Sequence, residues 1–203
     1  MINLSEEHYL AKGNARTCYI NPEDSAQCIK VNRIGTDSNS DQNSAEKFYI
    51  EKSKKIIKDL NSSKSILCGF YGPIETNLGD GLVFELIKDH DGNCSKTLAY
   101  FYKNNLLDKK IIRQIIIDIQ QKSIEQNVLI YDANMSNILL KKHQDGSFSP
   151  KIIDGFGGKR IDLKLKLRCY FPFIIKMKTK SSFEHLLYRF DNYSEKTDPS
   201  FLL

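Results

Sequence analysis

The sequence predicts an α+β protein: an N-terminal antiparallel sheet with one helix, followed by a mostly helical, shortened C-terminal lobe. Short apolar runs bounded by turn residues dominate the first part of the chain. One segment with the apolar spacing of a helix interrupts them, and longer segments of that kind dominate the second half. We expect one lobe over residues 1–87 and a reduced second lobe over 88–203.

Five strands and one helix are expected before residue 88. Turn residues such as those at 13–14 and 77–80 separate the runs, and the latter group is typical of a hairpin. A polar loop is expected over 35–43, and a helix with one wet face over 44–60, with Ser44 as its N-cap. The expected strands cover 8–12, 17–21, 26–33, 68–76 and 81–87.

The second half is predicted to be helical around a small β-ribbon. A short helix is expected over 95–104 and a strong one over 108–126, where Ile111, Ile112, Ile115, Ile116 and Ile119 form a wide apolar stripe. Beyond Arg160 the chain is basic and is expected to be helical. Strands are expected over 128–131, 137–141 and 151–153, with a turn at 143–147.

Composition and charge narrow the function classes. Of 203 residues, 40% are hydrophobic and 27% charged, as in ordinary globular proteins. The formal net charge of +5 leaves room for an anionic ligand and gives no strong nucleic-acid signal. Five scattered cysteines without a C-x-x-C pair argue against a disulfide framework and a thiolate zinc site. Because no signal peptide or membrane-spanning run is visible, we expect a cytoplasmic protein.

Three polar side chains follow apolar strands in the second half. An apolar run ends at Asp132, Asn137 comes five residues later, and a further apolar run ends at Asp154. We expect these side chains to gather at strand ends, where hard oxygen ligands suit Mg²⁺ together with phosphate oxygens. The alternative is an ordinary loop in which Asp and Asn act as turn formers.

This spacing resembles the protein-kinase-like superfamily, whose catalytic loop H-R-D-x-x-x-x-N is followed by a metal-binding D-F-G. The resemblance implies binding of ATP and Mg²⁺. It also implies that Asp132 is the catalytic residue that orients or deprotonates an acceptor hydroxyl. Asn137 and Asp154 then correspond to the metal ligands.

The resemblance extends to the first half. Lys30, in Cys-Ile-Lys-Val, resembles the catalytic lysine that grips the α- and β-phosphates, with Glu46 or Glu51 as its ion-pair partner. We favour Glu46 because it falls in the first turn of the expected helix. Taken alone, a lysine such as Lys30 is more often a solvent-facing strand residue, and a glutamate such as Glu46 is more often a charge on the helix surface.

Four further residues are assigned to the nucleotide by the same resemblance. Gly13 and Arg16 lie in the segment that corresponds to the phosphate loop, where Arg16 is expected to hold a phosphate by its charge. Glu85 and Ile87 fall where the hinge between lobes contacts adenine through backbone groups.

The chain is more closely similar to the bacterial YrbL family of PhoP-regulatory-network proteins, which has a kinase-like fold. The similarity covers roughly residues 5 to 160. The segments that carry it are Gly-Asn-Ala-Arg-Thr-Cys-Tyr (13–19), Cys-Ile-Lys-Val (28–31), Gly-Pro-Ile-Glu-Thr-Asn-Leu-Gly (72–79), Leu-Val-Phe-Glu-Leu-Ile (82–87) and Asp-His-Asp-Gly (89–92).

Several features depart from the kinase pattern. The phosphate loop has Gly13 almost alone instead of three glycines, and Ile130-Tyr131 replaces His-Arg. Asp154 is followed by Gly-Phe, no A-P-E follows, and the remaining chain is short for a full helical lobe. We therefore expect a phosphotransferase whose acceptor is a small molecule or a protein. The alternative is a pseudokinase that binds nucleotide without transferring phosphate.

Residues 159–189 combine many cations with apolar residues, against few acidic ones. Three interpretations remain open for this segment. It lies on an anionic membrane surface, it cradles an acidic substrate, or it forms core helices with a solvated basic face.

Overall fold

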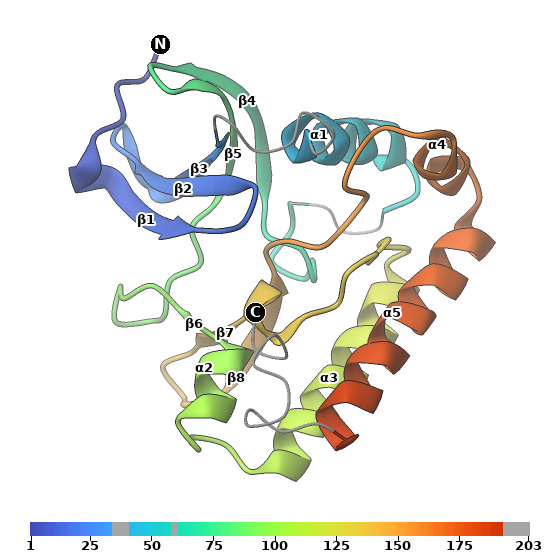
Figure 1. Cartoon of the computed structure of the whole chain (residues 1–203). Coiled ribbons are helices and arrows are strands. Elements are labelled where there is room, and N and C mark those ends of the chain that lie inside the picture. The colour runs from blue at the N-terminus through green and yellow to red at the C-terminus, as the bar shows by residue number, and fades with distance from the viewer. Residues whose placement is uncertain (34–40, 58–60, 193–203) are drawn as a thin grey trace.

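The computed structural model describes residues 1–33, 41–57 and 61–192, and it joins a five-stranded antiparallel sheet to a largely helical part that carries a small second sheet (Figure 1). In chain order the strands are β1 (Tyr9–Lys12), β2 (Arg16–Asn21), β3 (Asp24–Asn32), β4 (Phe70–Thr76), β5 (Gly79–Glu85), β6 (Lys96–Thr97), β7 (Ile138–Lys142) and β8 (Phe148–Ile152). The α-helices are α1 (Gln42–Ser53), α2 (Leu98–Lys103), α3 (Lys109–Glu125), α4 (Leu163–Tyr170) and α5 (Pro172–Asn192), and two short 3₁₀ helices cover Glu6–His8 and Met135–Asn137. The predicted α+β class with an antiparallel sheet is confirmed.

The large sheet has the strand order β1-β2-β3-β5-β4, with every neighbouring pair antiparallel. The central strand β3 alternates its side chains between two environments, as a pleated strand must. Ile29 and Val31 pack in a small cluster with Val83 on one face. Lys30 therefore points to the other face, where it is only 4% exposed. The solvent-facing alternative for Lys30 is wrong.

Helix α1 begins two residues before the predicted start. Its N-cap is Asp41, whose side chain accepts a hydrogen bond from the Ser44 backbone N–H, so the prediction of Ser44 as the cap is wrong. Asp and Ser are both good N-cap residues. The acidic side chain of Asp41 also interacts favourably with the positive end of the helix dipole. The helix ends at Ser53, short of the predicted end, and residues 34–40 of the expected loop and 58–60 lie outside the described residues.

The second sheet has the order β6-β7-β8, and the predicted strands over 137–141 and 151–153 correspond to β7 and β8. The helix expected to begin at 95 begins at Leu98, because Lys96–Thr97 pairs with β7 and the Thr97 side chain caps α2. The strand expected over 128–131 is wrong: only Ile130 forms an isolated bridge, with Phe156.

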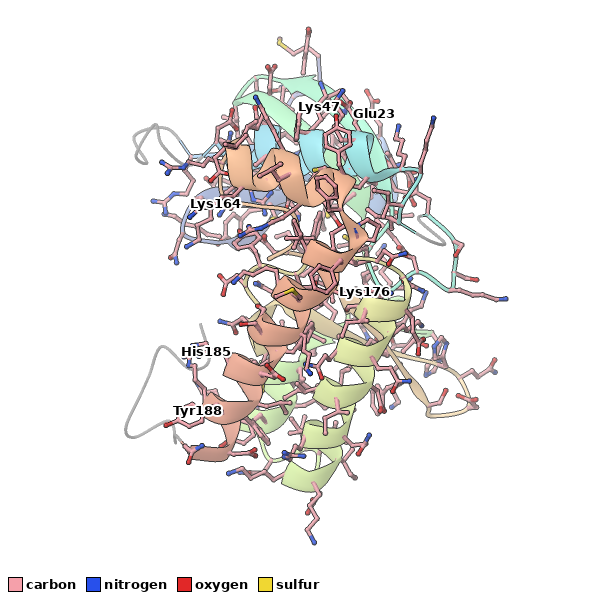
Figure 2. The ribbon with its side chains drawn as sticks, turned by 90° about the vertical axis from the view of Figure 1, so that its right-hand side faces the viewer. Glu23, Lys47, Lys164, Lys176, His185 and Tyr188 are labelled. Carbon is pink, nitrogen blue, oxygen red and sulfur yellow. The ribbon has the colours of Figure 1, made fainter. Side chains whose placement is uncertain are left out.

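Helices α3 and α5 lie side by side, and α4 packs against α1 of the first half (Figures 1 and 2). Ile112, Ile116 and Ile119 of the predicted α3 stripe are fully buried, whereas Ile111 is half exposed. One core runs from the large sheet to α5, and the expected boundary between 1–87 and 88–203 stays a prediction. None of the helices in the described residues is long and apolar enough to cross a bilayer.

Candidate functional site

Backbone hydrogen bonds bring the second-half polar residues together. The Gly155 carbonyl oxygen accepts the N–H groups of Tyr131 and Asp132, at 2.9 and 3.2 Å. The Ile153 N–H donates to the Asn137 carbonyl oxygen at 2.9 Å. Gly155 has φ of +79°, and a Cβ added there would lie 2.2 Å from the Asp132 carbonyl oxygen. Only glycine therefore fits between the Asp132 loop and Asp154.

Six of the predicted site residues line one cavity of about 380 Å³ between the large sheet and this loop region. That volume is within the range of small-molecule sites in proteins. The six residues are Gly13, Arg16, Lys30, Asp132, Asn137 and Asp154. We call this the central cavity.

Lys30 reaches the edge of the central cavity from β3. Its Nζ donates to the Ile153 carbonyl oxygen at 2.5 Å and lies 3.7 Å from Glu46 Oε2. It also lies 4.1 Å from the centre of the Phe84 ring, a cation–π contact. Burial alone would lower the pKa of Lys30, but the carboxylates of Glu46 and Asp154 act together against it and the pKa is raised. The ammonium group therefore stays charged.

Glu46 is 2% exposed, so its interpretation as a plain surface charge is wrong. It lies in the second turn of α1 and not in the first, because the helix begins at Gln42. Glu51, the alternative partner, is exposed. The contact between Glu46 and Lys30 is thus present, while the role assigned to that pair stays a prediction.

Arg16 bridges two carboxylates, a role that the sequence analysis missed. Its Nη1 lies 2.5 Å from Glu46 Oε2, and its Nη2 lies 2.6 Å from Asp154 Oδ2. Burial alone would lower the pKa of Arg16, but the two carboxylates raise it well above its usual range. The guanidinium that was expected to hold a phosphate is therefore engaged by protein groups, and its phosphate contact stays a prediction.

Asp154 is ionised in this environment. Burial would raise its pKa, but the charges of Arg16 and Lys30 and a hydrogen bond from the Gly155 N–H lower the pKa to about 2. One carboxylate oxygen thus faces Arg16, and the other accepts from backbone.

The protein supplies only part of the ligand set that a magnesium ion needs. Asn137 and Asp154 offer oxygen atoms to the same cavity, and Asp132 is exposed at its edge. Among the described residues, no group of three His, Cys, Asp or Glu side chains is arranged to hold a metal by itself. Mg²⁺ is usually bound by one or two carboxylates plus substrate phosphates and water, so the donor set matches that chemistry.

Buried hydroxyl groups support the loop before Asp132, and the sequence analysis missed them as well. The Thr179 Oγ1 accepts from the Ile130 N–H and donates to the Val128 carbonyl oxygen. The Tyr49 hydroxyl accepts from the Leu129 N–H at 2.7 Å. These bonds take the place of a strand partner, which explains why 128–131 is not a strand. Hydroxyl residues on amphipathic helices give no signal of such long-range contacts.

Glu85 and Ile87 do not line the central cavity. The Glu85 N–H donates to the Gly69 carbonyl oxygen, and the Ile87 carbonyl oxygen accepts from the Ser95 N–H. Both backbone groups are thus used within the protein, and the predicted adenine contact stays a prediction.

The basic segment 159–189 forms the loop after Asp154, α4 and most of α5. Its helices bury apolar residues such as Leu165 and Phe183 and expose others, including Leu163 (71%) and Phe173 (72%). The core-helix interpretation accounts for the buried residues. Contact with an anionic surface or substrate stays a prediction.

The fold and this cavity define a mixed α+β protein in which two buried cations face carboxylates from both halves of the chain. The family model described as PhoP regulatory network protein YrbL matches residues 2–191, and the chain belongs to this family. The match extends past the range of about 5 to 160 expected from the sequence and includes α4 and α5.

Two curated relatives are the proteins named uncharacterized protein YrbL in Escherichia coli (strain K12) and in Shigella flexneri. Each is 28% identical to this chain over 159 residues, which is 77% of this chain and 74% of the relative.

Proposed function

We propose that this protein is an ATP- and Mg²⁺-dependent phosphotransferase with a protein-kinase-like arrangement of its two parts. The observation that carries the proposal is the convergence of Lys30, Asp132, Asn137 and Asp154 on one cavity, although they come from widely separated parts of the chain. In kinases the same residue types, in the same order, position a triphosphate and its metal.

The pairing of Lys30 with Glu46 supports the phosphate-binding role. An ammonium group on a rigid central strand, fixed by a carboxylate and a backbone carbonyl, offers a positioned charge to a nucleotide phosphate. Burial makes this charge more effective than it would be in bulk water.

Mg²⁺, when bound with the nucleotide, would neutralise charge on the phosphate oxygens, and Asn137 and Asp154 are the residues that would hold it. If Asp154 held the ion through Oδ2, that oxygen would leave Arg16. Arg16 would then keep Glu46 as its partner and be free to face a phosphate.

Asp132 is suited to receive the acceptor. It is exposed, and among the described residues its carboxylate has no hydrogen-bond partner. A free carboxylate next to the phosphate site orients an acceptor hydroxyl and takes up its proton. The acceptor is a small molecule, such as a sugar or a lipid-linked group, or a protein.

Phosphate release or transfer from labelled ATP tests the proposal. Wild-type protein with Mg²⁺ and candidate acceptors should transfer the γ-phosphate, and Asp132→Asn should lower the rate by roughly 100-fold or more. Asp145→Asn, in the β7–β8 turn, is the matched control and should leave the rate unchanged. Tight ATP binding without transfer to any acceptor or to water would overturn the proposal.

A pseudokinase is the second candidate, and the Arg16–Asp154 ion pair favours it. An arginine that neutralises the predicted metal ligand fits a site that binds nucleotide without metal. If this candidate holds, Asp132→Asn leaves the cellular phenotype intact, whereas a bulky substitution at Leu86, near the expected hinge, abolishes it.

A further inference from the structure

A second cavity, of about 210 Å³, shares Tyr131 with the central cavity. Its wall comes from the loop after Asp154, from α4 and from α5. The lining residues are Tyr131, Gly158, Lys159, Arg160, Asp162, Leu165, Arg168 and Lys178. We call it the basic cavity.

We propose that the basic cavity binds a phosphate group carried by the acceptor. The assignment of this group to an acceptor rests on the proposed phosphotransferase function, whereas phosphate binding in the cavity stands without it. The proposal gives the acceptor a chemical class: a phosphorylated compound that also carries a free hydroxyl.

The charges in the basic cavity are not balanced by protein groups. Four cations face a single carboxylate, Asp162, which is already used as the N-cap of α4 through a 2.7 Å hydrogen bond from Leu165 N–H. Within the described ranges, none of the four cations has a carboxylate within ion-pair distance. Arg168 and Lys178 are half buried, so water screens their mutual repulsion less than at an open surface. A dianion would offset this cost.

The size and donor types of the cavity favour phosphate. A volume of about 210 Å³ is smaller than the roughly 300–1,000 Å³ of sites that enclose whole drug-sized molecules, so the cavity fits one group of a ligand. The planar guanidinium groups of Arg160 and Arg168 match the paired oxygens of a phosphate, and the lysines add point charges.

The position of Tyr131 connects the two cavities. It directly precedes Asp132 in the chain, and its backbone is fixed by Gly155. Burial raises the pKa of Tyr131, and the nearby carboxylates of Asp154, Glu46 and Asp132 raise it further, so its hydroxyl stays neutral and can donate. Because Tyr131 lines both cavities and directly precedes Asp132, a ligand anchored in the basic cavity lies beside Tyr131 and can extend a hydroxyl toward Asp132.

Phosphate binding by the nucleotide-free protein tests this proposal. Inorganic phosphate is titrated calorimetrically at constant ionic strength into wild type and into Arg168→Gln/Lys178→Gln. The double variant should bind roughly 100-fold more weakly or worse, because two charged hydrogen-bond donors to the phosphate are lost. The control, Lys164→Gln/Lys176→Gln, removes the same charge from exposed positions on the same helices and should bind as wild type does (Figure 2).

Equal phosphate affinity in the two double variants, or no binding by wild type, would overturn the proposal. Arg168 and Lys178 carry like charges that repel each other. Without phosphate, Arg168→Gln/Lys178→Gln should therefore melt no lower than wild type, and this result would show that its weaker phosphate binding does not come from unfolding. A separate titration with Mg²⁺–ATP keeps the two proposals apart. A wild type that binds phosphate through this cavity but does not bind ATP would contradict the proposed function alone.

Two sources of the phosphate group are separated by two further probes. Glycerol 3-phosphate tests a soluble acceptor, and phosphatidylcholine vesicles that carry lysophosphatidate, compared with vesicles of phosphatidylcholine alone, test a lipid headgroup that keeps a free hydroxyl. Binding of either probe that is lost in Arg168→Gln/Lys178→Gln and kept in the control supports the proposal and identifies the source. Equal binding of both probes by the two double variants counts against it.

Discussion

The Nη2 atom of Arg16 lies 2.6 Å from Oδ2 of Asp154 and links the β1–β2 region to the loop that follows β8. This contact joins a residue expected to bind phosphate to a residue expected to bind metal. In the ligand-free protein the two neutralise each other. A nucleotide phosphate at Arg16, or a metal ion at this oxygen of Asp154, would compete with the ion pair. The strength of the ion pair therefore affects both stability and ligand binding.

Replacement of Arg16 should destabilise the fold. In Arg16→Gln, Asp154 loses its ion-pair partner and Glu46 keeps only Lys30. Loss of one partner of a buried pair costs about 3–5 kcal/mol, and we expect about 2–3 kcal/mol here because Asp154 is partly exposed. Chemical denaturation measures the change. Arg113→Gln breaks the exposed pair with Asp191 and should cost less than about 1 kcal/mol. Equal losses would contradict the ion-pair assignment.

Acid should weaken the protein through Asp154. The pKa of this carboxyl falls to about 2 in the folded state, below the value of about 3.9 for an unfolded chain. A depressed folded-state pKa adds stability that is complete above about pH 4 and is lost as the pH falls toward 2. After discounting for solvent screening we expect about 1–2 kcal/mol.

Unfolding free energies of wild type and Asp154→Asn, measured between pH 5 and the lowest pH at which both fold, check this contribution. The difference between the two proteins should shrink as the pH falls. A difference that is constant or grows over this range would show that Asp154 is not held ionised by its neighbours.

Gly155 lies where the Asp132 loop and the backbone after Asp154 come into close contact, and a methyl group at this position should disrupt the contact. Gly155→Ala places a Cβ 2.2 Å from the Asp132 carbonyl oxygen at a positive φ, so we expect a loss above about 3 kcal/mol. The matched control is Gly146→Ala, which has a similar φ of +82° and no atom within 4 Å of the new Cβ. It should cost only about 1–2 kcal/mol, the price of the backbone conformation. Similar melting temperatures for the two variants would contradict the close approach at Gly155.

Thr179 should matter for its hydroxyl and not for its shape. Thr179→Val keeps the volume but leaves the buried Ile130 N–H and Val128 carbonyl without their partner. We expect a loss of about 1–3 kcal/mol and slower phosphate transfer, because this bond fixes the chain just before Asp132. Ser181→Ala, two residues further along α5 and exposed, should change stability by less than about 0.5 kcal/mol. A neutral Thr179→Val would show that the loop does not depend on α5.

The sequence was sufficient for the sheet, the long helices and the clustering of the second-half polar residues, because each has a local pattern. The sequence could not show which face of the sheet Lys30 occupies. Alternation along β3 places Lys30 opposite Ile29 and Val31, but it does not say which of the two faces is buried against the rest of the protein. The apolar run 128–131 is typical of a strand, yet its N–H groups bind hydroxyls on α1 and α5.

The ion-pair partners of Arg16 could likewise not be predicted from a local sequence pattern. They lie on α1 and after β8, and no spacing in the chain relates those positions to the first residue of β2. The cap of α1 is a smaller case: Asp41 and Ser44 both suit the position, and the choice depends on where the preceding chain leaves β3.

Calorimetric titration of ATP, with and without Mg²⁺, into wild type and Asp154→Ala tests the proposed nucleotide site most directly. We predict that wild type binds ATP more tightly with Mg²⁺, and that Asp154→Ala loses this increment while it keeps metal-free binding through Lys30. The same ATP affinity for wild type with and without Mg²⁺, or no ATP binding at all, would contradict the assignment of the central cavity to a magnesium–nucleotide complex.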